Sequence, residues 1–214
     1  MRKVLFLVLP LLVLAARPAP GTCGPLLNEV MADPARDWDG NGTYSYRDDE
    51  WVEIVNPGPG ALTLDGCFLA DEAGGLVYGF TGTLAEGGVK VVYGSQAVAW
   101  EVANDETATG LRLGNDGDTV QLLQRVGTST VVVDSFTYNT YEAEDDRSSG
   151  RLPDGSSTRA LFDGLNLYTG TTAPLTSGRP PTPGARNDGG TVVPPPTPSE
   201  ELTWGHVKRL YSLR

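Results

Sequence analysis

The apolar and polar positions between residues 26 and 138 follow the pattern of short strands. Runs of β-branched and aromatic residues are separated by Gly, Pro, Asn and Asp, which interrupt strands and form turns. The expected strands are residues 51–56, 62–64, 67–69, 76–78, 89–93, 119–123 and 130–138. The last two have the spacing of a β-hairpin. Because no segment here has the apolar period of a long helix, the pattern predicts an all-β fold, a β-sandwich of about seven to nine strands.

The beginning of the chain has a different pattern. A short basic start precedes an apolar run, residues 4–16, that is too short to span a bilayer. This pattern predicts a secretory signal peptide at residues 1–21, with cleavage after either Ala16 or Gly21. Acylation of Cys23 is the alternative, although the residues before it lack the aliphatic and small side chains of such a site. With no later apolar run of about 18 residues, we expect a secreted or cell-surface protein without a transmembrane segment in the mature chain.

The end of the chain divides into three parts. The domain is expected to cover residues 22–188, with its less regular part, residues 141–187, packed along the edge of the sandwich. Residues 189–201 are a Pro-rich linker, typical of an extended spacer. Residues 202–214 have apolar positions at helical spacing with basic residues between them, which predicts a short amphipathic tail that binds a partner; the alternative is a frayed terminus. The tail residues expected to contact the partner are Trp204, Val207, Lys208, Leu210 and Tyr211.

Composition and charge narrow the class of function. Gly and Pro supply 27 and 16 of the 214 residues, which excludes a mostly helical protein, and the 39% hydrophobic content is enough for one core. The 16 basic and 27 acidic residues give a net charge of -11, and without residues 1–21 there are 13 basic residues and a charge of -14. This charge opposes binding to nucleic acid or anionic lipid, so the expected partner is a protein or a cell-surface polysaccharide. The oligomeric state stays open.

The residue inventory also limits the chemistry. The one histidine, His206, is the ninth residue from the C-terminus, so the domain itself has no Ser-His-Asp or Cys-His site. Any function must therefore depend on carboxylates, hydroxyls, a metal ion or the shape of a surface.

An acidic segment at residues 37–48 has the spacing of a calcium-binding loop. It has oxygen-bearing side chains at positions 1, 3 and 5, Gly at position 6 and a carboxylate at position 12. Ca²⁺ prefers six to eight oxygen ligands, and alternate residues of a tight loop can point them inward. The alternative is a solvated loop whose side chains bond their own backbone. Further carboxylates are nearby at Asp33, Asp49 and Glu50. The expected ligands are Asp37, Asp39, Asn41, Thr43 and Asp48.

Two carboxylates lie in segments that should pair as strands. Glu29 and Glu53 would then face each other and could serve as the acid and base of a glycosidase. The alternative is that they cap loops, bind the same metal or bond backbone amides. We favour the alternative, because no helical layer or cleft-forming insertion surrounds them.

Several aromatic residues lie close to these segments. They are either a flat platform for stacking sugars or half-buried packing between strands. The residues are Trp38, Tyr44, Tyr46, Trp51, Tyr93 and Trp100.

The two cysteines, Cys23 and Cys67, are expected to pair. Export to an oxidising compartment favours one disulfide, which would close a loop of 44 residues (67 minus 23). In the chain-entropy model, such a crosslink stabilises the fold by roughly 3 to 4 kcal/mol.

Four sequence blocks together resemble the lamin-tail domain in its secreted bacterial form. The resemblance spans about residues 26–187 and implies an immunoglobulin-like β-sandwich without catalytic activity. Eukaryotic relatives contact chromatin and filament partners, a role that we do not transfer to an exported, acidic chain. The blocks are residues 27–34 (LNEVMADP), 49–57 (DEWVEIVNP), 117–122 (GDTVQL) with 133–135, and 150–155 (GRLPDG) with 181–184 (PTPG).

These observations favour one function over two others. The leading hypothesis is a non-enzymatic extracellular or cell-surface module for binding or scaffolding, with one disulfide and a bound Ca²⁺. The alternatives are a secreted hydrolase of polysaccharide or phosphoester that uses Glu29 and Glu53, and a targeting appendage that acts through its C-terminal tail.

Overall fold

The computed structural model describes residues 24–171 and 175–189. The predicted signal peptide, Cys23, the C-terminal tail and all of the linker except residue 189 lie outside these ranges, so the predictions on them stay predictions. In the described part, no helix has the length and apolar character needed to cross a bilayer.

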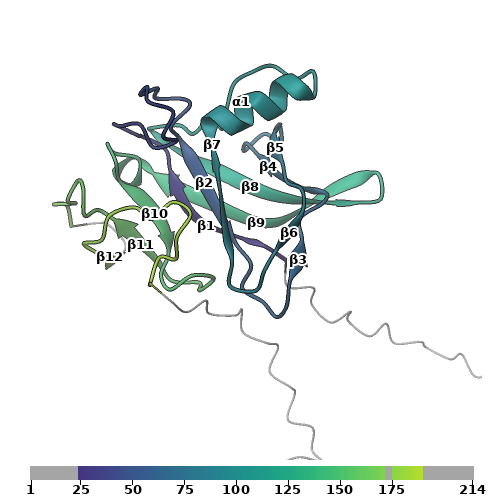
Figure 1. Cartoon of the computed structure of the whole chain (residues 1–214). Coiled ribbons are helices and arrows are strands. Elements are labelled where there is room, and N and C mark those ends of the chain that lie inside the picture. The colour runs from purple at the N-terminus through teal and green to yellow at the C-terminus, as the bar shows by residue number, and fades with distance from the viewer. Residues whose placement is uncertain (1–23, 172–174, 190–214) are drawn as a thin grey trace, which may run out of the picture.

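The strands form two large sheets and one small one (Figure 1). The six-stranded sheet has the order β12-β11-β10-β1-β2-β7, and the four-stranded sheet has the order β5-β4-β8-β9. The first contains β1 (Leu26–Met31), β2 (Trp51–Val55), β7 (Val89–Tyr93), β10 (Ser148–Arg151), β11 (Arg159–Phe162) and β12 (Leu175–Thr176). The second contains β4 (Cys67–Ala70), β5 (Leu76–Gly79), β8 (Gly117–Val126) and β9 (Ser129–Asn139), and the small sheet pairs β3 (Leu62–Thr63) with β6 (Thr83–Leu84). The prediction of an all-β, immunoglobulin-like sandwich is confirmed.

The main core lies between the two large sheets. Leu27 and Ile54 from the first sheet and Leu69 and Phe136 from the second are all fully buried in one cluster. Alternation along β4 sends Cys67 and Leu69 into this core, while Phe68 and Ala70 pack with Leu123 in a second cluster. Each fully buried large apolar side chain contributes about 1.5 to 3 kcal/mol.

The predicted hairpin is present and longer than expected. Strands β8 and β9 pair from Gly117 and Asn139 to Val126 and Ser129. Gly127 in the turn has φ +63°, a left-handed conformation that favours glycine.

A helix after β7 was not expected. Helix α1 (Gly94–Ala103) packs against β5 and β7. Its pattern is hard to detect because its buried positions are Gly94, Ala97 and Glu101, of which only one carries an apolar side chain. Trp100 packs on β5, where Gly79 makes room: a Cβ at residue 79 would lie 2.8 Å from the indole Nε1.

The segment at 141–187 does more than follow the edge of the sandwich. It begins with the 3₁₀ turn η1 (Thr140–Glu142) and then adds β10, β11 and β12 to the six-stranded sheet beyond β1. Strand β10 reads Ser-Ser-Gly-Arg, yet all four residues are buried. Their polar groups are satisfied inside the protein; for example, Ser149 Oγ donates to Glu142 Oε1 at 2.6 Å. A buried strand of polar residues has no hydrophobic pattern, so periodicity did not reveal it.

Candidate functional site

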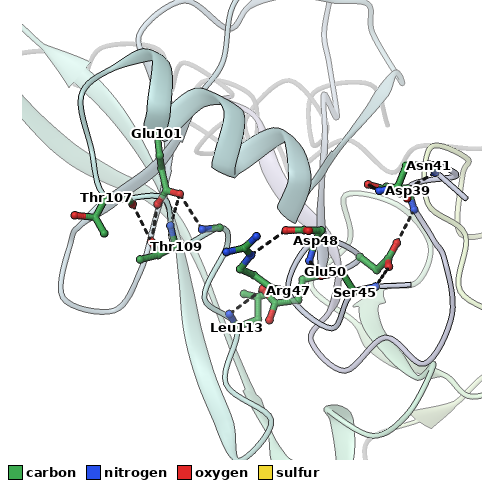
Figure 2. Close-up of polar contacts among 12 residues, drawn as sticks. Asp39, Asn41, Ser45, Arg47, Asp48, Glu50, Glu101, Thr107, Thr109 and Leu113 are labelled. Atoms are coloured by element: carbon green, nitrogen blue, oxygen red, sulfur yellow. Dashed lines mark hydrogen bonds and ion pairs between the residues drawn. The ribbon is translucent and has the colours of Figure 1, made fainter. Parts of the chain in front are cut away.

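The segment between β1 and β2, residues 32–50, is named here the acidic loop. It lies beside the start of α1 (Figure 2). Two backbone bonds join them: Gly94 N donates to Glu50 O at 2.8 Å, and Ser95 N donates to Asp48 O at 3.0 Å. The loop carbonyls therefore accept from N–H groups at the helix N-terminus that have no partner within the helix.

Asp37 organises the first half of this loop. Its Oδ1 accepts from the N–H groups of Gly40 (2.8 Å) and Asn41 (3.1 Å), and its Oδ2 accepts from that of Gly42 (2.8 Å). Gly40 and Gly42 have φ angles of +72° and +90°, so this tight turn requires glycine at both positions.

Asp39 and Asn41 continue the same pattern. Asp39 Oδ1 accepts from Asn41 N at 3.0 Å, and Asn41 Oδ1 accepts from Thr43 N at 2.8 Å. Partial burial tends to raise the pKa of Asp39, but hydrogen bonds from Ser95 and Asn41 outweigh it and lower that pKa below its usual range. Asp39 is therefore ionised at neutral pH.

Asp49 closes the loop from the other side. It is fully buried, and its Oδ1 accepts from Trp38 N (2.7 Å) and Asp39 N (3.0 Å) while its Oδ2 accepts from Ser45 N (2.8 Å). One carboxylate thus connects both halves of the loop to the residues just before β2.

These contacts bring three carboxylates together. A carboxylate oxygen from each of Asp37, Asp39 and Asp49 lies within 4.8 Å of the other two. Within residues 24–171 and 175–189, no other His, Cys, Asp or Glu group of three or more has this spacing. Because an ionised carboxylate has about four lone-pair positions, these oxygens can accept backbone bonds and still ligate a cation.

The structure places the predicted ligands differently from the sequence motif. Asp37 and Asp39 belong to the group, and Asn41 and Thr43 lie in the same exposed turn. Asp48, expected at position 12, instead forms an ion pair with Arg47 at 2.9 Å, and Asp49 takes the place facing the loop. Asp48 and Asp49 lie in the turn just before β2, where Asp49 N donates to Ser45 O at 3.0 Å. In this turn the carboxylate of Asp49 is directed to the N–H groups of Trp38 and Asp39.

Two buried glutamates hold the surrounding loops (Figure 2). Glu101 on α1 accepts from Thr109 N at 2.7 Å, Thr109 Oγ1 at 2.6 Å and Gly110 N at 2.8 Å. Glu50 accepts from Leu113 N at 3.3 Å, and burial raises the pKa of Glu50 to about 8. Nothing in the sequence pattern singled out Glu101, whose one local signal is a carboxylate within an otherwise apolar stretch.

The proposed acid pair, Glu29 and Glu53, does face each other in the β1–β2 register, but neither is open to solvent. Residues 179–188, named here the C-terminal strap, lie over them. Thr182 N donates to Glu29 Oε1 at 3.2 Å, and Gly184 N donates to Glu53 Oε2 at 2.8 Å. This is the arrangement that we favoured from the sequence, in which the carboxylates bond backbone amides.

The six aromatic residues do not form one flat exposed surface. Trp51 is fully buried and packs edge-on against Trp38, with ring centroids 6.2 Å apart. Trp100 packs against Phe68 in the second cluster. Tyr46, 73% exposed, is the most accessible of the large hydrophobic side chains described.

Comparison with known proteins gives one match. The family model described as Lamin Tail Domain matches residues 18–140, more than half of the chain. The match includes the acidic loop, helix α1 and the β8–β9 hairpin, and it ends before the strap. Searches of curated proteins and of solved structures gave no match.

Proposed function

The chain belongs to the lamin tail domain family of immunoglobulin-like binding and scaffolding modules, and on that premise we propose a non-enzymatic binding module, secreted or at the cell surface, whose acidic loop binds Ca²⁺. Members of the family are generally non-enzymatic. The observation that carries the proposal is the grouping of Asp37, Asp39 and Asp49 at an exposed end of the sandwich.

The burial of Glu29 and Glu53 favours binding over hydrolysis. An acid and a base must reach the bond that they cleave, and a glycosidase needs space for a sugar between its two carboxyl groups. Here both side chains are fully buried, and the strap donates hydrogen bonds to each. Turnover of a polysaccharide or phosphoester that Glu53→Gln abolishes would contradict the proposal.

Loop geometry supports a site for a hard cation. Hydrogen bonds from backbone N–H groups already hold these carboxylates in place. Binding an ion therefore costs little further ordering of the loop. Asn41 and backbone carbonyls of the turn can supply further oxygens. Extracellular calcium modules bind in the 10⁻⁴–10⁻³ M range, which suits a surface loop in which Asp37 and Asp39 are at least partly accessible and Asp49 is buried.

The calcium proposal predicts a thermal shift. Calcium at a hundredfold excess over its Kd should stabilise the folded protein by about 2.7 kcal/mol relative to a chelator, because the ion binds only the folded loop. Asp39→Asn should abolish most of the shift. Differential scanning fluorimetry in Ca²⁺, Mg²⁺ and EDTA measures it.

Asp145→Asn is the matched control. Asp145 is an exposed acid whose charge, like that of Asp49, acts on Tyr44, so this variant removes one charge from the same end without touching the group of three. It should keep the calcium shift. An equal loss in both variants would mean that calcium acts only by screening charge, and no shift in the wild type would contradict the site.

The proposed partner is a protein or a cell-surface polysaccharide. The net charge of -11 supports a partner that is neutral or basic rather than nucleic acid. Retention on an immobilised cell-envelope polysaccharide, in calcium and in EDTA, tests the polysaccharide directly. We expect calcium-dependent retention that Asp145→Asn keeps and Asp39→Asn loses.

The disulfide between Cys23 and Cys67 is also a proposal. Cys67 is buried, with its Sγ donating to Gln124 Oε1 at 3.1 Å, and Gly24 lines the same surface pocket as Gln124. Gly24, the residue that follows Cys23 in the sequence, therefore lies near the hydrogen-bond partner of Cys67, which supports the proposal.

We expect the unfolded, unreduced protein to show no free thiol by maleimide labelling and mass spectrometry. Reduction should lower the unfolding free energy by roughly 3 to 4 kcal/mol. Cys23→Ser should match the reduced wild type and not respond to reductant. Two reactive thiols in the unreduced wild type would show that the bond does not form.

A further inference from the structure

A buried polar network fastens the C-terminal strap to the six-stranded sheet. Ser148 Oγ on β10 donates to Glu29 Oε1, and Asn28 Nδ2 on β1 donates to Glu53 Oε1 at 2.8 Å. Thr182 and Gly184 of the strap complete the hydrogen bonds of the two glutamates.

The Thr182 hydroxyl has two partners that are both normally acceptors. Its Oγ1 lies 2.8 Å from Glu29 Oε2 and 2.7 Å from Asn187 Oδ1. The amide of Asn187 is oriented by its other end, because Nδ2 donates to Arg151 O at 2.9 Å. A hydroxyl has one proton to donate, so one of these two contacts needs a proton from the partner. Of the two partners, only Glu29 can carry it.

Glu53 shows the opposite arrangement. Its two oxygens accept from Asn28 Nδ2 and Gly184 N, each at 2.8 Å, and both of these groups are donors only. An ionised carboxylate suits such partners. Two facing carboxyl groups in a buried site repel each other when both are charged, so one shared proton is the stable state of the pair.

We propose that Glu29 is protonated when the strap is closed, donating from Oε2 to Thr182 Oγ1, and that loss of this proton loosens the strap. The Thr182 hydroxyl then donates to Asn187, and each contact has one donor and one acceptor. The strap thereby becomes a pH-sensitive element of the domain, separate from the acidic loop.

The charges around Glu29 act in the same direction. Glu53 faces it from β2, and Asp154 acts on it from the loop after β10. Asp154 in turn hydrogen-bonds the side chain of Asp188 at the end of the strap. Burial raises the pKa of Glu29 to about 7 and that of Glu53 to about 8, and it also raises the pKa of Asp154. The hydrogen-bond partners of each carboxyl group, not these pKa values, assign the shared proton to Glu29.

The arginines of β10 and of the strap form hydrogen bonds with groups other than Glu29. Arg151 on β10 donates to Leu27 O, Ser156 O and Asp134 Oδ2, and Arg179 of the strap donates to Asn187 O. No hydrogen bond from either guanidinium to Glu29 is present among the described contacts.

The sign of the pH effect follows from these pKa values. An unfolded Glu has a pKa near 4.5, and the folded value is about 7, so the protonated form favours the closed strap. This stabilisation is complete below about pH 4.5 and is lost as the pH rises through 7. Because burial also raises the pKa of Glu53 and of Asp154, the contribution of Glu29 must be measured against a variant.

Glu29→Gln is that variant. Its amide oxygen can accept from Ser148 and Thr182 N, and its NH₂ group can donate to Thr182 Oγ1, as protonated Glu29 does. We expect a Tm equal to or above that of the wild type, and a smaller fall in Tm between pH 5 and 8.5. The matched variant Glu53→Gln must point an NH₂ group at a donor, so it should lose stability at every pH.

Limited trypsin cleavage measures the strap itself. Arg186 in the strap bonds Gly87 O through Nε (3.1 Å) and Nη2 (2.9 Å), and cleavage after it requires the strap to open. Mass spectrometry of the fragment that ends at residue 186 gives the rate for purified wild type and Glu29→Gln. The ratio of the two rates at each pH cancels the pH dependence of trypsin.

We expect the wild type to be cleaved several-fold faster than Glu29→Gln at pH 8.5 and at a similar rate at pH 6. A ratio that is the same at both pH values would overturn the proposal. So would equal destabilisation by Glu29→Gln and Glu53→Gln, because it would mean that both carboxyl groups are needed in ionised form.

Discussion

Replacing Gly94 with alanine is expected to destabilise the domain by about 4 kcal/mol or more, which is exceptional for a single methyl group. A Cβ on residue 94 would lie 1.9 Å from the carbonyl oxygen of Arg47 and 3.1 Å from the Cα of Asp48. These atoms are backbone, so no side-chain rotation relieves the clash. The acidic loop and α1 would have to separate, breaking the bonds from Gly94 N and Ser95 N.

The sign of this effect is a strict test of the structure. Within a helix, Gly→Ala normally stabilises by roughly 0.5 to 1 kcal/mol, so helix propensity alone predicts the reverse. Urea unfolding at 25 °C gives the free energy. Gly24→Ala is the control, because a Cβ there meets nothing within 4 Å and should change stability little. A stabilising Gly94→Ala would mean that α1 does not contact the loop as described.

Replacing Arg151 with methionine should cost about 3 to 5 kcal/mol. Arg151 on β10 donates to Leu27 O at 2.7 Å and to Asp134 Oδ2 at 2.9 Å, and Asp134 on β9 also accepts from Leu27 N at 2.8 Å. The two sheets therefore meet through one largely buried ion pair. Methionine keeps most of the aliphatic volume but leaves a charge and two carbonyl groups without their partner.

Two further variants separate the effect of the buried charge from that of the lost side-chain volume. Adding Asp134→Asn to Arg151→Met should recover part of the loss, since it neutralises the carboxylate left behind. Arg36→Met should cost at most about 1 kcal/mol, because the Arg36 side chain, paired with Asp146, is 51% exposed. Equal costs for the Arg36 and Arg151 variants in urea unfolding would contradict the role given to burial.

In this domain, several buried polar groups hold separate segments of the chain together. Glu101, Asp49, Arg151 and the strap network each connect segments that are separated by turns or by the space between the sheets. The exposed acidic loop is thus presented on a supported frame, which is what a recognition surface requires.

The sequence alone determined the features that depend on neighbouring residues. Short apolar runs and turn residues indicated the strands, and the β8–β9 hairpin followed from two such runs around Gly127. Glycine at position 6 of the acidic loop, Gly42, indicated its tight turn correctly. The ordered blocks of residues identified the family. In the strands, the hairpin turn and the loop, the determining residues lie within a few positions of one another.

Tertiary structure alone decided the features whose partners are distant in the chain. Thr182 and Glu29 are 153 positions apart, so no local pattern could show that the strap closes over a carboxyl pair. Strand β10 is polar but buried. Asp49 rather than Asp48 faces the loop, because its carboxylate accepts from the backbone N–H groups of Trp38 and Asp39, 11 and 10 positions earlier in the chain. Periodicity reports which face of an element is apolar, whereas the partner of a buried polar group is fixed only when distant segments pack together.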